Sequence, residues 1–414
     1  MIVAVLILLA VFLLIAIRQI GKLKLQIWLI MLIGALCSLF TGQITILNAL
    51  KSINIEVMLF LFGMFVVGQA LDESGVLGHI SYSLFRKAKS ANLLILSVLF
   101  VMGIASAFLM NDTIAIIGTP IVLLLAKSHK LPPKLLLLSL AFAITIGSAM
   151  SPIGNPQNLL IALNDEIHNP FITFLKYLLM PTAINLLIAF FFLRLFYRSS
   201  FSGGILNHSQ EEIKDPNLAK LSGISLALII LMIMLKISVV FLGLGINLRI
   251  TYIALIPAIF LLLFSQKRVG LVRRIDWHTL IFFAAMFVLM ESVWDSGFFQ
   301  SLMASLNSNL VSIPMIFFIS IVLSQFISNV PLVALYLPIL SHIGISAKQM
   351  IALAAGSTIA GNLFILGAAS NVIIIQNAEK KSGETLTFWD FAKIGVPLTI
   401  ANTLVYMFFI WVVP

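Results

Sequence analysis

The feature that most constrains this chain is a series of long apolar runs, each close to the length of helix that crosses a lipid bilayer. The hydrocarbon core needs about 20 residues of α-helix. Runs of this kind lie at 2–17, 25–41, 57–71, 91–110, 135–163, 171–193, 221–242, 250–264, 279–294, 311–327, 351–375 and 389–413. Hydrophobic residues make up 61% of the 414 positions and charged residues only 10%, so a soluble globular fold is excluded. The sequence predicts an all-α polytopic membrane protein.

Two further apolar pieces, at 113–126 and 331–340, are too short to cross the bilayer alone. As helices they would reach about 21 and about 15 Å, against a hydrocarbon core of about 30 Å. We therefore predict that each is the returning leg of a re-entrant hairpin, at about 91–127 and about 311–341. Two thin or tilted spans are the alternative, because bilayers and helices adapt to mismatch. The hairpins leave about ten crossings.

Positive charge is distributed unevenly over this predicted topology. All but five of the 25 Lys and Arg residues fall on one side of the membrane. The five on the other side are Lys51, Lys176, Lys236, Arg249 and Lys348. Because positive residues gather in cytoplasmic loops, we expect both termini outside and a cytoplasmic linker at 199–220. The same asymmetry explains the net charge of +10, so nucleic acid is not an expected partner.

Three short patterns recur in the same order in the two halves of the chain. Met-Phe-Val and Ser-Gly at 64–66 and 74–75 recur at 286–288 and 296–297, Asn and Pro at 111 and 120 recur at 329 and 338, and Gly and Asn at 154 and 158 recur at 367 and 371. The offsets are 222, 218 and 213 residues. Each half holds an odd number of crossings, so the halves must be inserted in opposite directions. We predict inverted repeats at 1–198 and 221–414, an arrangement of secondary transporters whose binding sites lie near the midplane.

Polar residues gather at the tips of the two predicted hairpins, where burial in lipid is unfavourable, by roughly 2.5–3.5 kcal/mol for an Asp at a helix centre. The first tip carries Asn111, Asp112 and Thr113, and the second carries Ser328 and Asn329. An Asn side chain offers both an acceptor and donors, so it can meet a cation or an anionic oxygen. Capping of the hairpin legs is the alternative role.

The long runs after the hairpins hold two more polar stretches. Pro152, Gly154 and Pro156 interrupt helical hydrogen bonding, so we predict a broken helix at about 135–163. Freed carbonyl groups can bind a cation there, and the next half-helix presents its N-terminus to an anion. The matching run at about 350–376 contains no proline and is the weaker case. Close packing of helices by Gly and Ser is the alternative role.

The Asn-bearing tips, with GNPQN at 154–158 and GAASN at 367–371, resemble the ion transporter superfamily of divalent anion/sodium symporters, citrate transporters, arsenite permeases and some sodium/proton antiporters. The resemblance implies a homodimer in a prokaryotic inner membrane, in which hairpins and broken helices slide against a dimer-forming scaffold. In carboxylate-carrying members both tips read Ser-Asn-Thr, and neighbouring backbone binds sodium. Here the tips read Met-Asn-Asp at 110–112 and Ser-Asn-Val at 328–330, closer to the arsenite-permease branch.

The residues and the resemblance together predict an ion-coupled transporter of a small anion or an inorganic oxyacid. The expected substrate ligands are Asn111, Thr113, Asn155, Asn158, Asn329, Ser370 and Asn371. The expected ion-coupling residues are Asp112, Ser148, Gly154, Ser328, Gly367 and Ala368, with sodium at Asn111, Gly154, Asn329 and Gly367 or a proton on Asp112. No cofactor and no enzymatic activity are expected, because Asp112 has no second acid or buried His beside it. Sodium/proton exchange without such a substrate is the alternative function.

Overall fold

The computed structural model describes the chain except for residues 1, 18, 21–22, 25, 163, 165–166, 168, 202–205, 207–211, 242–248, 299–300, 302–310 and 345. The helices are α1 (Ile2–Ile17), α2 (Ile27–Phe40), α3 (Ile46–Ser52), α4 (Ile55–Ser74), α5 (Val76–Phe85), α6 (Ala91–Leu109), α7 (Asn111–His129), α8 (Pro133–Ser148), α9 (Pro156–Ala162), α10 (Pro170–Phe196), η1 (Arg198–Phe201), α11 (Pro216–Phe241), α12 (Ile250–Phe264), α13 (Arg268–Arg274), α14 (Trp277–Asp295), α16 (Ile313–Ile327), α17 (Asn329–Ile343), α18 (Ala347–Ile359), η2 (Ala360–Asn362), η3 (Ile365–Gly367), α19 (Ala369–Ser382) and α20 (Phe388–Val412). The strands β1 (Gln19–Ile20) and β2 (Leu23–Lys24) pair antiparallel.

This architecture confirms the predicted helical membrane fold. Among the described residues, 7 helices are long and apolar enough to cross a bilayer: α4, α6, α7, α10, α11 up to residue 236, α14 and α20. Several of the shorter helices, including α1, α2, α8 and α12, are equally apolar. A chain with so many apolar helices and so few charges can expose its outer surface only to lipid.

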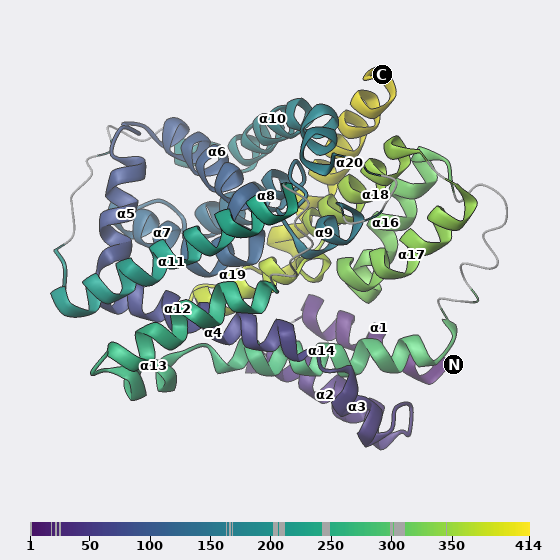
Figure 1. Cartoon of the computed structure of the whole chain (residues 1–414), viewed down its shortest axis with the longest axis horizontal. Helices are drawn as coiled ribbons and strands as arrows, with labels where there is room; N and C mark the ends of the chain where they lie inside the picture. Colours follow the sequence, from purple (N-terminus) through teal and green to yellow (C-terminus); the bar gives the residue numbers. More distant parts are fainter. Residues whose placement is uncertain are drawn as a thin grey trace.

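The helices pack as two layers that each draw on both halves of the sequence. Layer A contains α1–α4 and α11–α14, and layer B contains α6–α10 and α16–α20. In Figure 1 most of layer A occupies the lower part of the molecule and layer B the upper part, with α11 of layer A running obliquely across the middle and α7 and α19 near the boundary. Purple helices therefore lie beside teal and green helices in layer A, and blue to teal helices lie beside green and yellow helices in layer B.

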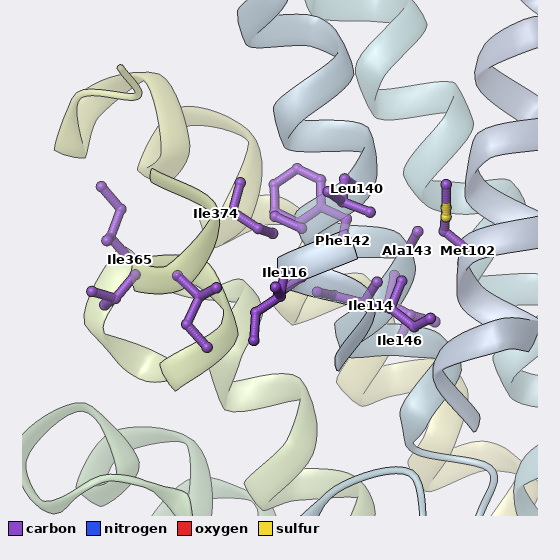
Figure 2. Packing of buried hydrophobic residues seen from close by; sticks show 14 of the residues in the cluster. Met102, Ile114, Ile116, Leu140, Phe142, Ala143, Ile146, Ile365 and Ile374 are labelled. Atoms are coloured by element: carbon purple, nitrogen blue, oxygen red, sulfur yellow. The ribbon is translucent and has the colours of Figure 1, made fainter. Parts of the chain in front are cut away.

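Helix α8 forms the centre of layer B. All its residues from Leu135 to Ser148 are buried, which is the pattern of a helix covered by neighbours on every side. Figure 2 shows Leu140 and Phe142 of α8 among side chains from α6, α7 and α19. Helices α6 and α8 pack closely at Gly147, which faces the backbone of Gly103. The segment that follows α8 is thus held on a tightly packed support.

The two predicted hairpins consist of α6 with α7 and of α16 with α17. A single residue joins the legs of each, Met110 in the first and Ser328 in the second. The returning legs are longer than predicted, with 19 residues in α7 and 15 in α17, because the polar tip residues are themselves helical. The length criterion was therefore wrong for α7, which could cross a bilayer. The tip residue Met110 is 7% exposed, and the re-entrant course of the two hairpins stays a prediction.

The described parts of the predicted linker at 199–220 contact the end of α4 and the segment that follows α5. The Lys214 backbone N–H donates to the Ser74 carbonyl oxygen over 3.0 Å, and the Leu206 N–H donates to the Lys89 carbonyl oxygen over 2.9 Å. Much of this linker, and the ends of the predicted runs at residues 25, 163 and 242, lie outside the described residues.

Candidate functional site

The two hairpin tips have the same unusual backbone conformation. Met110 has φ 65° and ψ 143°, and Ser328 has φ 66° and ψ 159°. Among the described residues, Lys130 is the only other non-glycine residue with a positive φ. A side chain in this region costs about 1–3 kcal/mol, and such strain clusters at functional sites. The adjacent Asn111 and Asn329 are both buried, with 7% and 6% of their surfaces exposed.

The first broken helix is closed by the side chain of Asn158. Helix α8 ends at Ser148, and the Asn158 Nδ2 donates to the carbonyl oxygens of Ser148, Ala149 and Ser151 over 3.2, 3.3 and 3.0 Å. These are the carbonyl groups that the break frees from helical hydrogen bonding. One side-chain amide therefore binds three carbonyl oxygens of the first break. Fewer carbonyl oxygens remain free for a cation than we expected from the sequence.

The first tip contacts the first break through backbone atoms. The Asn111 N–H donates to the Gly154 carbonyl oxygen over 2.9 Å. A Cβ at Gly154 would clash with the Ser148 carbonyl oxygen, so only glycine allows the chain to fold back so tightly. The structure thus brings the predicted residues Asn111, Gly154 and Ser148 together.

The second break is longer than the first, contrary to its prediction as the weaker case. Regular α-helix stops at Ile359 and resumes at Ala369, with η2 and η3 between. Glycine produces this interruption without proline: a Cβ at Gly367 would clash with the Ala360 carbonyl oxygen and lie 2.7 Å from the Gln325 Oε1. Two nearby amides bind its freed carbonyl groups. The Asn371 Nδ2 donates to the Gly361 oxygen over 2.6 Å, and the Gln325 Nε2 donates to the Ala360 oxygen over 2.9 Å.

Buried oxygen atoms without a hydrogen-bond partner concentrate at the second tip and break. They are Gln325 Oε1, Asn329 Oδ1, Asn362 Oδ1, Ser370 Oγ and Asn371 Oδ1. Among the described residues of the first tip and break, Asp112 Oδ1 is the one such atom. Buried polar atoms are almost always paired with protein, water or an ion. The second half therefore offers more free acceptors for a cation than the first.

The two breaks meet at Thr358 of α18. The Asn155 Nδ2 donates to the Thr358 Oγ1 over 3.1 Å, and the Thr358 Oγ1 donates to the Asn158 Oδ1 over 3.1 Å. The residue equivalent to Thr358 at the offset of 213 is Thr145, which lies against Gly361 of the second break. Each break is thus contacted by a threonine from the other half, although Thr145 Oγ1 makes no hydrogen bond.

A polar pair in the first break is replaced by a close apolar pair in the second. The Asn155 Nδ2 donates to the Ser148 Oγ over 3.2 Å. At the offset of 213 the corresponding residues are Ala368 and Gly361, and a Cβ at Gly361 would lie 2.7 Å from the Ala368 Cβ. The two breaks therefore share a backbone plan and differ in the side chains that they present.

One cavity lies beside each hairpin tip, and the two are lined by equivalent positions of the two halves. Met110, Ile153, Asn155, Leu159 and Ile253 line the first, and Ser328, Leu366, Ala368, Val372 and Met31 line the second. These pairs match at the offsets of 218, 213 and 222 that the sequence patterns show. In both cavities the tip and the break belong to layer B, while one wall comes from layer A.

The predicted site residues thus fall into two groups. Those at the first tip and break are Asn111, Asp112, Ser148, Gly154, Asn155 and Asn158, and those at the second are Ser328, Asn329, Gly367, Ala368, Ser370 and Asn371. Thr113 is buried further along α7, at 2% exposure. Sequence reasoning missed three residues at the site: Gln325, Thr145 and Lys236. The first and last are polar groups within apolar runs, and the repeat offset would have paired Thr145 with Thr358.

Buried hairpin tips beside interrupted helices, within a polytopic helical fold, define a membrane transport protein. A family model described as "Citrate transporter" matches residues 5–348. The chain belongs to this citrate transporter family, in agreement with the resemblance to the ion transporter superfamily.

Relatives in other organisms match most of the chain. The silicon efflux transporter LSI3 of Oryza sativa subsp. japonica is 27% identical over an alignment covering 90% of each protein. A 46 kDa membrane protein of Mycobacterium leprae is 25% identical, covering 87% of this chain and 86% of that protein. The human P protein is 25% identical, covering 88% of this chain and 54% of that protein. The solved structure of the Alcanivorax borkumensis YdaH transporter has a TM-score of 0.49 and 15% identity, over 99% of this chain and 96% of that one.

Proposed function

We propose that this protein is an ion-coupled secondary active transporter of a small anion or an inorganic oxyacid. The observation that carries the proposal is the convergence of the two breaks, joined through Thr358, next to two strained and buried hairpin tips. A helix bundle that served only as a structural anchor would not require two interrupted helices at its centre. The citrate transporter family and the named silicon efflux relative support a solute of this class.

The polar atoms at the site suit an anion bound together with a cation. The tips and breaks contain no Lys or Arg, so these segments would contact the solute through amides, hydroxyls and backbone N–H groups. The unpaired oxygens at Asn329, Ser370, Asn371 and Gln325 are acceptors of the kind that bind sodium. A sodium ion at the second tip would compensate part of the negative charge of the solute.

We propose alternating access of the elevator type, with layer B carrying the site along layer A. Both tips, both breaks and the residues that bind them lie in layer B. The two layers meet at the cavities beside the tips, which is where a moving unit would pass a fixed wall. The same proposal includes a homodimer formed by layer A, with both termini outside a prokaryotic inner membrane and the linker in the cytoplasm.

A flux panel on the purified protein in proteoliposomes tests the function. Citrate, succinate, arsenite, silicic acid and sodium are compared with and without sodium and pH gradients. Gradient-driven accumulation of one of the first four solutes supports the proposal. If only sodium and protons exchange, the alternative function holds.

The alternative is favoured by one atom, the unpaired Oδ1 of Asp112 at the first tip. A carboxyl oxygen that is buried without a partner can carry a proton or face a cation. Asp112→Asn keeps the size of the side chain and removes its titration, so we expect flux to lose its dependence on the pH gradient. The matched variant is Asn329→Asp, which adds a carboxylate at the second tip where Asp112→Asn removes one at the first. An unaltered dependence on both pH and sodium in Asp112→Asn would show that Asp112 has no coupling role.

A further inference from the structure

The cavity beside the first hairpin tip is lined in part by a lysine side chain that comes from the opposite layer. Lys236 of α11 lines this cavity together with Met110 of the tip and Asn155 and Leu159 of the break. It is the only ionisable residue among those that line it. The hydrogen bonds of the Asn155 side chain are already made to Ser148, Thr358 and the Asn158 N–H, so among the lining residues Lys236 has the polar group that is left for a ligand.

The charge of Lys236 is not neutralised by an ion pair in the described part of the chain. The carboxylate whose charge acts on Lys236 is Glu56, and this group is paired with Arg249 over 3.0 Å. The remaining described ion pairs involve other lysine and arginine residues. An ammonium group has three donors and no acceptor, so an anion is its natural ligand.

Lys236 and the first tip also lie at similar depths. Twenty residues of α11 separate Pro216 from Lys236, a rise of about 30 Å. Nineteen residues of α6 lead to Met110, a rise of about 28 Å. Both helices begin on the face predicted to be cytoplasmic, so the two rises put Lys236 and Met110 at similar depths. This depth is near the outer end of the hydrocarbon core, in agreement with the predicted position of Lys236 on the outer side, and the cavity brings the two residues together.

The equivalent cavity in the other half has no such group. The residue equivalent to Lys236 at the offset of 222 is Leu14, and the second cavity is lined by Met286, Met290, Phe282, Gln325 and other uncharged residues. Positive charge therefore lies beside the first tip, whereas unpaired acceptor oxygens lie beside the second. This difference suits an anion on the first side and a cation on the second.

We propose that Lys236 is a substrate-binding residue, whose ammonium group binds a carboxylate or oxyanion group of the solute in the cavity between α11 and the first hairpin tip. This inference rests on the proposed function. Because Lys236 belongs to layer A and the tip to layer B, the contact forms only when layer B is at the depth seen in this structure. Lys236 therefore contacts the solute in only one of the two access states, and in that state it favours a negatively charged solute.

The test compares Lys236→Gln and Lys236→Arg with the wild type in proteoliposomes, using citrate, succinate and phosphate as probes. Lys236→Gln should raise KM at least 10-fold with little change in the saturated rate, because binding is lost uniformly, and Lys236→Arg should restore most of it. Lys51→Gln is the matched control, since Lys51 is exposed on α3 and lines none of these cavities. A lysine that only reaches toward water predicts unchanged KM in all three variants, which would overturn the proposal.

A second measurement does not depend on transport. In a Cys37→Ser background, which removes the one native cysteine, Lys236→Cys is labelled with a thiol reagent in the presence of each probe. Slower labelling of the cysteine in the presence of at least one of the three anions supports the proposal. Recovery of uptake after a reagent that attaches an ammonium group, without recovery after a reagent that attaches a neutral group, supports it as well. Transport by the wild type without any protection at position 236 overturns the inference alone. Absence of flux for every solute on the panel overturns the proposed function.

Discussion

At the scale of single residues, equivalent asparagines have different structural roles. The Asn158 side chain makes four hydrogen bonds, to three carbonyl groups of the first break and to Thr358. Asn371 occupies the same repeat position and makes one, to Gly361, with its Oδ1 free. The first asparagine therefore stabilises the fold of its break, while the second keeps an acceptor available for a ligand.

The expected consequence is a difference in stability between two matched variants. Asn158→Ala should destabilise the protein by about 2–4 kcal/mol, and Asn371→Ala by about 1 kcal/mol, because each lost hydrogen bond contributes about 1 kcal/mol and buried partners are left unpaired. Thermal unfolding in detergent should give a clearly lower midpoint for Asn158→Ala. In contrast, sodium should stabilise the wild type and Asn158→Ala but not Asn371→Ala. Equal midpoints for the two variants would contradict the assignment.

At the scale of elements, the site depends on how closely α6 and α8 pack. A Cβ at Gly147 would clash with the backbone of Gly103, and the Ser106 Oγ of α6 donates to the Ile144 carbonyl oxygen over 3.0 Å. Small residues at a helix contact allow backbones to approach within lipid, where association depends on packing and interhelical hydrogen bonds. This contact positions the first tip relative to the first break.

Gly147→Ala is therefore expected to force α6 away from α8. Overpacking of this kind costs about 1–3 kcal/mol, and it should lower both the yield of monodisperse protein and the unfolding midpoint. Gly223→Ala on α11 is the control, because nothing lies within 4 Å of its added Cβ and alanine favours a helix by about 1 kcal/mol. Similar behaviour of the two variants would show that the contact is not a tight one.

At the scale of the whole molecule, an ion pair joins the two layers. Lys381 of α19 in layer B is paired with Asp72 of α4 in layer A. A second pair lies within layer B, where the Lys134 Nζ and the Asp390 Oδ2 are 2.7 Å apart. Elevator movement would break the first pair and leave the second intact.

Removal of the first pair should therefore change transport kinetics. Partly exposed ion pairs contribute up to about 1 kcal/mol, so Lys381→Gln should speed solute exchange at saturation by up to roughly 5-fold if separation of the layers limits the rate. Lys134→Gln, the same substitution within one layer, should leave the exchange rate unchanged. Exchange assays with solute on both sides of the membrane measure this. Equal rates in the two variants would argue against movement between the layers.

The sequence predicted much of the fold and part of the site. Apolar runs located the helices, and three short repeated patterns located the tips at Asn111 and Asn329 and the breaks at Gly154 and Gly367. The prolines of the first break led to the prediction that the second break, which has none, is the weaker case. The second break depends on the close packing around Gly367, which the sequence does not show. The leg length of α7 was also misjudged, since the polar tip residues Asn111 and Asp112 are helical.

Composition and apolar run length by themselves determined that this chain lives in a membrane, because burial in lipid selects apolar helices of a set length. The inverted repeat stays a prediction from the constant offsets between the two halves. Only the tertiary structure decided which polar atoms are satisfied and which remain free. Contacts between residues distant in sequence decide that Asn158 binds the carbonyl groups of its break while Asn371 keeps a free acceptor. They also decide that Lys236 lies near the first tip. Hydrogen bonding and charge pairing act over a few ångströms in space, and no spacing along the chain specifies that distance.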